Sequence, residues 1–360
     1  MELLVFMKKL ISVCLIISIC WICLSSCSGG GADSVITING KTEVDSEVFS
    51  YFLNEAYYGN NGFSENDCVE LATSESMKYI AVNTRFAQSG KTLSANEKAQ
   101  VSRETNALWR MYGSYLSKIG VSKDTYFKIK QYEYFKENLR FSLYDTDGTQ
   151  PINEDYIKQY FTTNYAGIKY LYEELYTPAS DAQIAAMSEN EKSIYESDKK
   201  NAGERYNYIS AIANYVNSGF YTMDEAFMAV TGEVSADVSV SAMVINRNSG
   251  LFRTEQVEAM LKQSVGSAFI ITNQSRSHVY LIERVDLLDP NYGFYEQYRD
   301  ECLRAVSESF FANEINTWIQ SYTAVRHLAV VNQCLSKIKD IDRSQYVGTA
   351  DYNFAAMPAV

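Results

Sequence analysis

The two end regions of this chain have the apolar spacing of helices. The segment between them contains runs of residues typical of β-strands. Tyr132, Phe135, Leu139 and Leu143 fall at spacings of three and four residues, which places them on one face of a helix. The central strand-like runs are 168–172, 240–245, 268–272 and 279–285, and helical segments at 202–219, 224–230 and 256–263 separate them. This order predicts a small α+β domain between two helical regions.

The second helical region carries a longer apolar stripe. Its members recur at spacings of four and three: Phe311, Ile315, Trp318, Tyr322, Val325 and Ala329. This pattern predicts one helix through that range. We favour its packing back onto the N-terminal helices over a coiled coil, because the stripe is shorter than about three heptads.

Cap and turn residues delimit the elements before the central segment. The run 34–42 is β-rich and broken by Asn39-Gly40, which predicts a hairpin. Helix starts are predicted at Asp45, Ser64, Ser94, Ser122 and Asn153. The turn 145–148 and Pro151 separate the first helical region from the rest of the chain.

The first 26 residues have the pattern of an export signal. Lys8 and Lys9 precede an apolar run from Leu10 to Cys23, which is short for a bilayer span of about 20 residues. The stretch 24–27 reads Leu-Ser-Ser-Cys and resembles a bacterial lipobox, which implies that Cys27 becomes the lipid-bearing N-terminal residue. We expect residues 1–26 to be removed, 27–33 to form a flexible tether, and the protein to face the extracytoplasmic side of the cell membrane. An uncleaved anchor and an ordinary secretory peptide are the alternatives.

Composition excludes several classes of function. The net charge is −12, which argues against nucleic-acid binding because that depends on clustered Lys and Arg. With His278 and His327 as the only histidines, a multi-histidine metal site is out of reach, and we expect no metal and no cofactor. The sequence has no G-x-x-x-x-G-K, G-x-G-x-x-G, G-x-S-x-G or H-E-x-x-H motif.

Three cysteines come after Cys27, namely Cys68, Cys302 and Cys334, and they form no C-x-x-C pair. We expect them to be buried and unpaired, with a Cys302–Cys334 bridge left possible. The 28 tyrosines supply large amphipathic side chains that fill cores and contact other proteins.

Four stretches, taken in order, resemble the exported parvulin-type foldases of the PrsA and SurA kind. They are Ile36–Tyr51, Lys118–Ser122, Pro151–Phe161 and Leu261–Val285. The resemblance implies a helical chaperone domain built from both chain ends, with a parvulin-like prolyl-isomerase domain inserted in it. The implied boundaries are 34–165 with 289–342 for the helical domain, 166–288 for the insert, and 343–360 for a loose C-terminal tail.

The sequence departs from that family at the catalytic positions. Parvulin catalysis uses two facing histidines, and here Tyr170 and Tyr280 stand at the corresponding places. His278 lies two residues before Tyr280, so it shares the sheet face but sits further along the strand. The family's glycine-rich stretch is absent from 233–248, and Glu233 and Asp237 are equal candidates for its acidic member.

The resemblance implies a membrane-anchored chaperone or foldase that binds unfolded or nascent exported proteins, with weak or lost isomerase activity. Tyr170 and Tyr280 are the candidates for lining its proline pocket. An active peptidyl-prolyl isomerase and an adaptor lipoprotein with one dedicated envelope partner are the alternatives, and a dimer is possible.

Overall fold

The computed structural model describes residues 33–59, 62–232, 240–273, 275–342 and 345–346. It mixes helices with two small antiparallel sheets, which agrees with the predicted α+β class. The chain divides into two compact units, Met1–Pro151 with Ser307–Val360, and Ile152–Val306. The predicted signal segment, Cys27 and most of the predicted tail lie outside the described residues. Among the described helices, none is both long enough and apolar enough to cross a bilayer.

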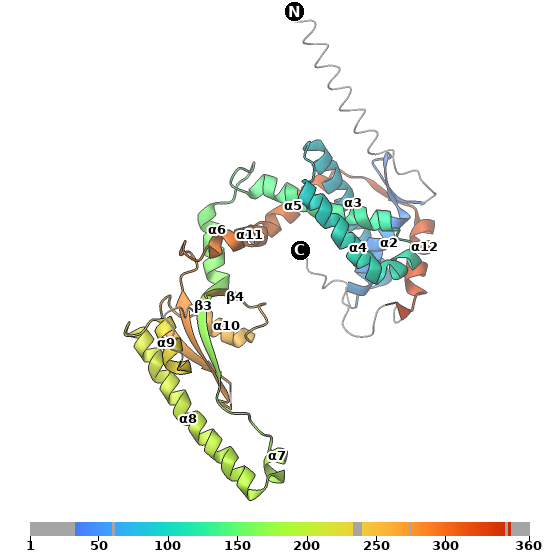
Figure 1. The fold of residues 1–360 in the computed structure, drawn as a ribbon. Helices are drawn as coiled ribbons and strands as arrows, with labels where there is room; N and C mark the ends of the chain where they lie inside the picture. Colours follow the sequence, from blue (N-terminus) through green and yellow to red (C-terminus); the bar gives the residue numbers. More distant parts are fainter. Residues whose placement is uncertain (1–32, 60–61, 233–239, 274, 343–344, 347–360) are drawn as a thin grey trace, which may run out of the picture. The chain divides into compact units, whose positions relative to one another are not determined.

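The first unit is built mainly from helices whose starts match the predicted caps (Figure 1). They are α2 (Ser46–Gly59), α3 (Glu65–Gln88), α4 (Ala95–Lys118) and α5 (Lys123–Tyr144). Ser64 and Ser94 each accept a hydrogen bond from the backbone three residues later and form capping boxes. Ser122 caps α5 in the same way, without the reciprocal bond.

The predicted stripe on α5 packs inside this unit. Tyr132 and Leu139 are buried. Phe135 stacks on Phe86 of α3 with ring centroids 4.1 Å apart. At the start of α5, Glu47 of α2 accepts hydrogen bonds from the backbone N–H of Ser122 and from the hydroxyls of Ser122 and Thr125. The helices are therefore joined by apolar packing and by polar contacts such as those of Glu47.

A three-stranded sheet joins the two chain ends of this unit, in the order β2-β1-β7. The predicted hairpin forms from β1 (Ser34–Ile38) and β2 (Thr42–Asp45). The prediction of one helix from Phe311 to Ala329 was wrong. Here α11 (Phe294–Ile319) ends early, β7 (Ala324–Arg326) pairs with β1, and α12 (Leu328–Lys339) comes next and contacts α2. Strand pairing takes over because β1 offers backbone partners that a longer helix would leave unused.

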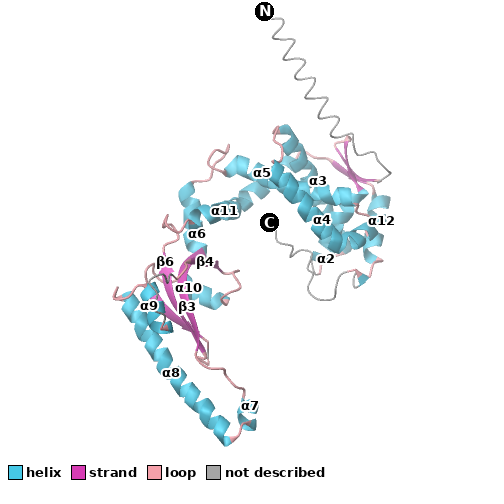
Figure 2. Ribbon diagram, viewed as in Figure 1, coloured by secondary structure: helices cyan, strands magenta, loops and turns pink. Residues whose placement is uncertain are grey.

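The second unit centres on a four-stranded antiparallel sheet in the order β4-β3-β6-β5 (Figure 2). Its strands are β3 (Tyr165–Glu174), β4 (Met243–Asn246), β5 (Ala268–Thr272) and β6 (His278–Val285). One face packs on α8 (Glu189–Asn217) and α9 (Met223–Thr231) through a cluster that includes Leu171 and Leu281. The opposite face packs on α10 (Thr254–Leu261) through a cluster that includes Ile168 and Ile282.

Helices flank this sheet in the sequence as well. The second unit takes in α6 (Glu154–Asn164), which begins at the predicted cap Asn153, and the first half of α11. Glu154 of α6 pairs with Arg299 of α11, with an oxygen–nitrogen distance of 2.9 Å. The short helix α7 (Asp181–Ala186) was not predicted, and α8 starts 13 residues before its predicted start at Ala202, so the acidic run 188–192 belongs to a solvated helix.

Candidate functional site

Five aromatic rings gather on the α10 side of the four-stranded sheet. They belong to Tyr170, Tyr172, Phe252, His278 and Tyr280. Tyr172 of β3 lies directly opposite Tyr280 of β6, and Glu174 lies opposite His278. Because side chains alternate between faces along a strand, every second residue of both strands points to this side.

Tyr280 is the centre of the group. Its ring centroid lies 5.0 Å from Tyr172, 5.1 Å from Phe252, 5.8 Å from His278 and 6.1 Å from Tyr170. These separations are those of interacting aromatic pairs, which contribute about 0.5–1.5 kcal/mol each beyond area burial. The structure therefore holds Tyr280 in place through four ring contacts.

A cavity of about 470 Å³ opens beside these rings. We call it the sheet cavity; its lining residues are Gly250, Leu251, Phe252, Arg253, Glu255, Gln256, Thr272, Asn273, His278 and Tyr280. The volume falls in the range of small-ligand sites, about 300–1,000 Å³. The aromatic walls suit an apolar side chain, while Arg253 and Glu255 supply charges of both signs.

Burial also affects the ionisation of Tyr280. Burial raises the pKa of Tyr280 above its ordinary value of 10, and the neighbouring Tyr172 and Tyr170 add to the effect. Tyr280 is therefore a neutral phenol at physiological pH, able to donate or accept a hydrogen bond but not to act as a base. Such a site can bind and orient a chain segment, and prolyl isomerisation requires no covalent step.

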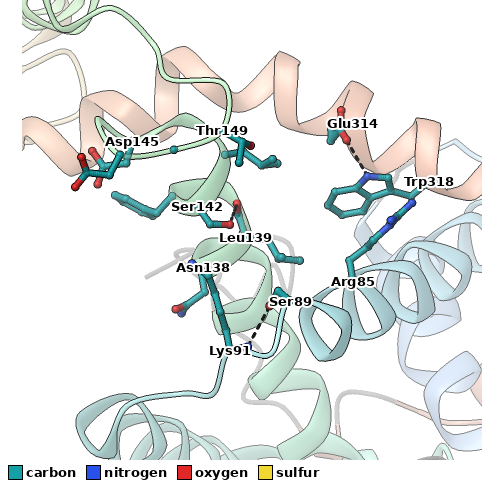
Figure 3. A pocket seen from close by; sticks show the side chains of 14 residues that line it. Arg85, Ser89, Lys91, Asn138, Leu139, Ser142, Asp145, Thr149, Glu314 and Trp318 are labelled. Atoms are coloured by element: carbon teal, nitrogen blue, oxygen red, sulfur yellow. Dashed lines mark hydrogen bonds between the residues drawn. The ribbon is translucent and has the colours of Figure 1, made fainter. Parts of the chain in front are cut away.

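A second hollow of about 670 Å³ lies in the helical unit (Figure 3). We call it the helical pocket, and its walls come from α3, α5 and the second half of α11. Trp318 of α11 donates to Glu314 and faces Arg85 of α3, whose guanidinium carbon is 5.6 Å from the ring centre. The pocket therefore combines an aromatic wall with both signs of charge.

The loop after α5 forms one rim of the helical pocket. Thr149 and Gln150 donate backbone hydrogen bonds back to Ser142 and Leu143. Gly148 permits this fold-back, because a Cβ at that position would lie 2.4 Å from the carbonyl oxygen of Leu143. The rim geometry thus depends on glycine at this position.

Solved structures to which this chain is similar include three PrsA foldases. The foldase protein PrsA of Lactococcus lactis has 13% identity and a TM-score of 0.36, and the match covers 85% of this chain and 99% of that one. PrsA of Streptococcus pneumoniae has 11% identity and a TM-score of 0.32, covering 88% and 100%. PrsA of Bacillus subtilis has 13% identity and a TM-score of 0.26, covering 79% and 85%. No protein-family model and no curated protein sequence matches the chain.

The structure brings the two predicted pocket tyrosines together. Tyr170 and Tyr280 share one face with His278, as the strand register requires. Phe252 and Tyr172 were missed. Tyr172 could have been found by extending the alternation of β3 by two residues, whereas no local signal marks Phe252, because it comes from the loop before α10.

The remaining candidates lie elsewhere. Glu233, Asp237 and Cys27 fall outside the described residues. His327 comes directly before α12. Its Nε2 is 3.0 Å from the hydroxyl of Thr37, so it is a single hydrogen-bonded histidine outside the lining of the sheet cavity.

The expectation for the three later cysteines is confirmed, because Cys68, Cys302 and Cys334 are buried and unpaired. Within the described residues, no cluster of His, Cys, Asp and Glu has the grouping of a metal site.

Proposed function

We propose that this protein is a lipid-anchored extracytoplasmic foldase that binds unfolded exported polypeptides. The observation that carries the proposal is the sheet cavity, whose wall includes Phe252 and Tyr280. Tyr170 and Tyr172 stand behind this wall through edge-to-face and tilted ring contacts with them. Aromatic faces accept many apolar side chains without strict sequence choice, which suits a binder of unfolded chains. Cys27 would carry the lipid that holds the protein at the membrane.

The composition of the same cavity favours the proposal that isomerase activity is weak or lost. In the resembled family two facing histidines frame the proline, and tyrosines stand at those positions here. Tyr280 is a neutral phenol at the centre of the cluster, and the lining of the cavity includes one imidazole, that of His278. Binding depends on shape and apolar surface, whereas catalysis also needs groups that favour the twisted amide.

The helical unit would supply a second contact surface for the client chain. The helical pocket offers Trp318 together with Arg85 and Glu314, so it can accept an apolar side chain flanked by charged ones. The proposed domain boundaries are those implied by the sequence, with the helical domain at 34–165 and 289–342 and the parvulin-like domain at 166–288.

One observation favours an active isomerase as the second candidate. His278 contacts Tyr280 and Tyr172, with ring centroids 5.8 and 5.9 Å apart, so an imidazole and two phenols converge beside the cavity. These groups can hydrogen-bond a prolyl amide. A catalytic site of this kind would lose its activity on replacement of either His278 or Tyr280.

Suppression of client aggregation tests the proposal. Tyr280→Ala should weaken the suppression of aggregation of a denatured model protein, whereas Tyr156→Ala, at a tyrosine that is 52% exposed on α6, should not. Equal suppression by the wild type and by Tyr280→Ala would exclude the sheet cavity as the client site. Recovery of a single stoichiometric partner from native envelopes would favour the adaptor alternative over a general chaperone.

A further inference from the structure

Among the residues that the structure describes, the outer edge of β5 has unpaired backbone groups next to the sheet cavity. β5 is an edge strand of the described sheet, where its partner is β6. At the start of β5, the backbone N–H and C=O of Ala268 point away from β6. The N–H donates to the side-chain oxygen of Asn217 (2.8 Å), and the C=O accepts from the side-chain nitrogen of the same residue (2.7 Å). Asn217 thus occupies the place of a neighbouring strand at this one position.

The register identifies which other groups face outward. Antiparallel partners alternate between hydrogen-bonded and non-hydrogen-bonded pairs, so every second residue of an edge strand directs its N–H and C=O away from the sheet. Ala268 opposite Glu283 is a non-hydrogen-bonded pair, because Arg284 donates to Ser267 just before it. Ile270 and Thr272 therefore face the open edge, while Phe269 and Ile271 bond to β6.

No hydrogen bond covers the outward backbone groups of Ile270 and Thr272 within the part of the chain that the structure describes. Unpaired strand edges are templates for another strand, and proteins usually block them. Of the residues described in the structure, Asn217 blocks Ala268, and none blocks Ile270 or Thr272. Thr272 also lines the sheet cavity, so the open edge and the cavity are continuous.

We propose that a client polypeptide binds as an added strand on the edge of β5, pairing with Ile270 and Thr272 beside the sheet cavity. The occupant is an extended segment of unfolded chain, because extended backbone presents C=O and N–H groups at the spacing that pairs with both residues at once. Backbone pairing supplies affinity without sequence choice, and the cavity receives one side chain. The inference rests on the proposed function and specifies how the client is held.

Amide hydrogen exchange of the full chain tests the pairing directly. The probe is a ten-residue peptide in which apolar and polar residues alternate. On saturation, exchange of the Ile270 and Thr272 amides should slow at least tenfold, while Phe269 and Ile271, already bonded to β6, should change little. Saturable binding with unchanged exchange at Ile270 and Thr272 overturns the edge proposal and leaves the proposed function intact.

Two other outcomes would also overturn the proposal. Slowed exchange that depends on protein concentration without peptide would mean that a second copy occupies the edge. Absence of saturable binding of this peptide and of a denatured model protein would overturn the proposed function as well.

A matched pair of variants separates backbone from side chain. Ile270→Pro removes an N–H that β6 does not use and obstructs the edge, and proline is tolerated on edge strands with that orientation. We expect it to weaken peptide binding about tenfold, the effect of losing one or two backbone hydrogen bonds, while Ile270→Ala stays within about twofold. Equal losses in both would assign the effect to packing and overturn the proposal.

If the proline variant fails to fold, N-methylated peptides test the same backbone hydrogen bonds on the wild-type protein. Methyl groups on alternate residues along one edge of the peptide should abolish binding, and methyl groups on the other edge should not. Equal binding of the two peptides would contradict strand addition.

Discussion

Replacing Glu47 should destabilise the helical unit in a pH-dependent way. One carboxylate oxygen of Glu47 accepts three hydrogen bonds at the start of α5, from the Ser122 N–H at 3.0 Å, from the Ser122 hydroxyl, and from the Thr125 hydroxyl at 2.6 Å. Burial of the carboxyl alone would raise its pKa, but the bonds from Ser122 and Thr125 outweigh burial and hold the pKa below its ordinary value of 4.5.

The magnitude of the destabilisation comes from those three bonds. A hydrogen bond to a charged group contributes about 1.5–3 kcal/mol, but the site is partly exposed and both hydroxyls can turn to water after the change. We therefore expect Glu47→Ala to lower the free energy of unfolding by about 2 kcal/mol at pH 7, or Tm by about 4–8 °C. Glu47→Gln keeps an acceptor and loses the charge, so its loss should be about half as large.

The sign of the pH dependence is fixed by the lowered pKa. Stability contributed by a carboxyl with a depressed folded-state pKa is fully present above its unfolded value and is lost as pH falls through the folded-state pKa. The difference between wild type and Glu47→Ala should therefore be complete at pH 7 and should shrink below pH 4.5. Thermal unfolding recorded by circular dichroism at pH 7 and at lower pH measures this. An equal difference at every pH, or no difference at pH 7, would show that the Glu47 carboxylate does not stabilise the start of α5.

Three further predictions concern stability and reactivity. Gly148→Ala should destabilise the protein by about 1–3 kcal/mol because its Cβ has no room, whereas Gly203→Ala, in an open position on α8, should be neutral or stabilising by up to about 1 kcal/mol; chemical denaturation of both variants checks this. Burial raises the pKa of the Cys302 thiol to about 12, so this cysteine should resist alkylation at pH 8 until the protein is denatured, as mapped by mass spectrometry, and rapid labelling of the native protein would contradict its burial. Arg299→Lys should cost about 1–2 kcal/mol because it loses the two-pronged contact with Glu154; an unchanged urea midpoint would show that the contact contributes nothing.

Local signals predicted much of the helical unit. The capping boxes at Ser64 and Ser94 set helix starts through bonds that span three residues, so they can be read from short stretches of sequence. The pairing of β7 with β1 joins segments almost 290 residues apart, and no local pattern encodes it. For that reason a continuous stripe across Tyr322 was mistaken for one helix.

The site was predictable where it depends on strand alternation. Tyr170, Tyr280 and His278 share a face because the two strands keep their register, and the sequence shows both strands clearly. Phe252 reaches the same cavity from a loop, whose position is set by packing of α10 on the sheet. The open edge of β5 depends on strand order, which the sequence of a single strand does not contain.

Binding and isomerisation measured on the same samples would decide whether the sheet cavity holds clients without catalysing their isomerisation. A fluorescein-labelled peptide with one proline is titrated with wild-type protein and with Tyr280→Ala, and cis/trans isomerisation of the peptide is recorded in parallel. We predict saturable binding that weakens about tenfold in Tyr280→Ala, the loss of about 1.4 kcal/mol expected from its aromatic contacts, with isomerisation at the uncatalysed rate in both. Equal affinity in the two proteins, or catalysis in the wild type that disappears in Tyr280→Ala, would contradict a cavity that binds clients without efficient catalysis.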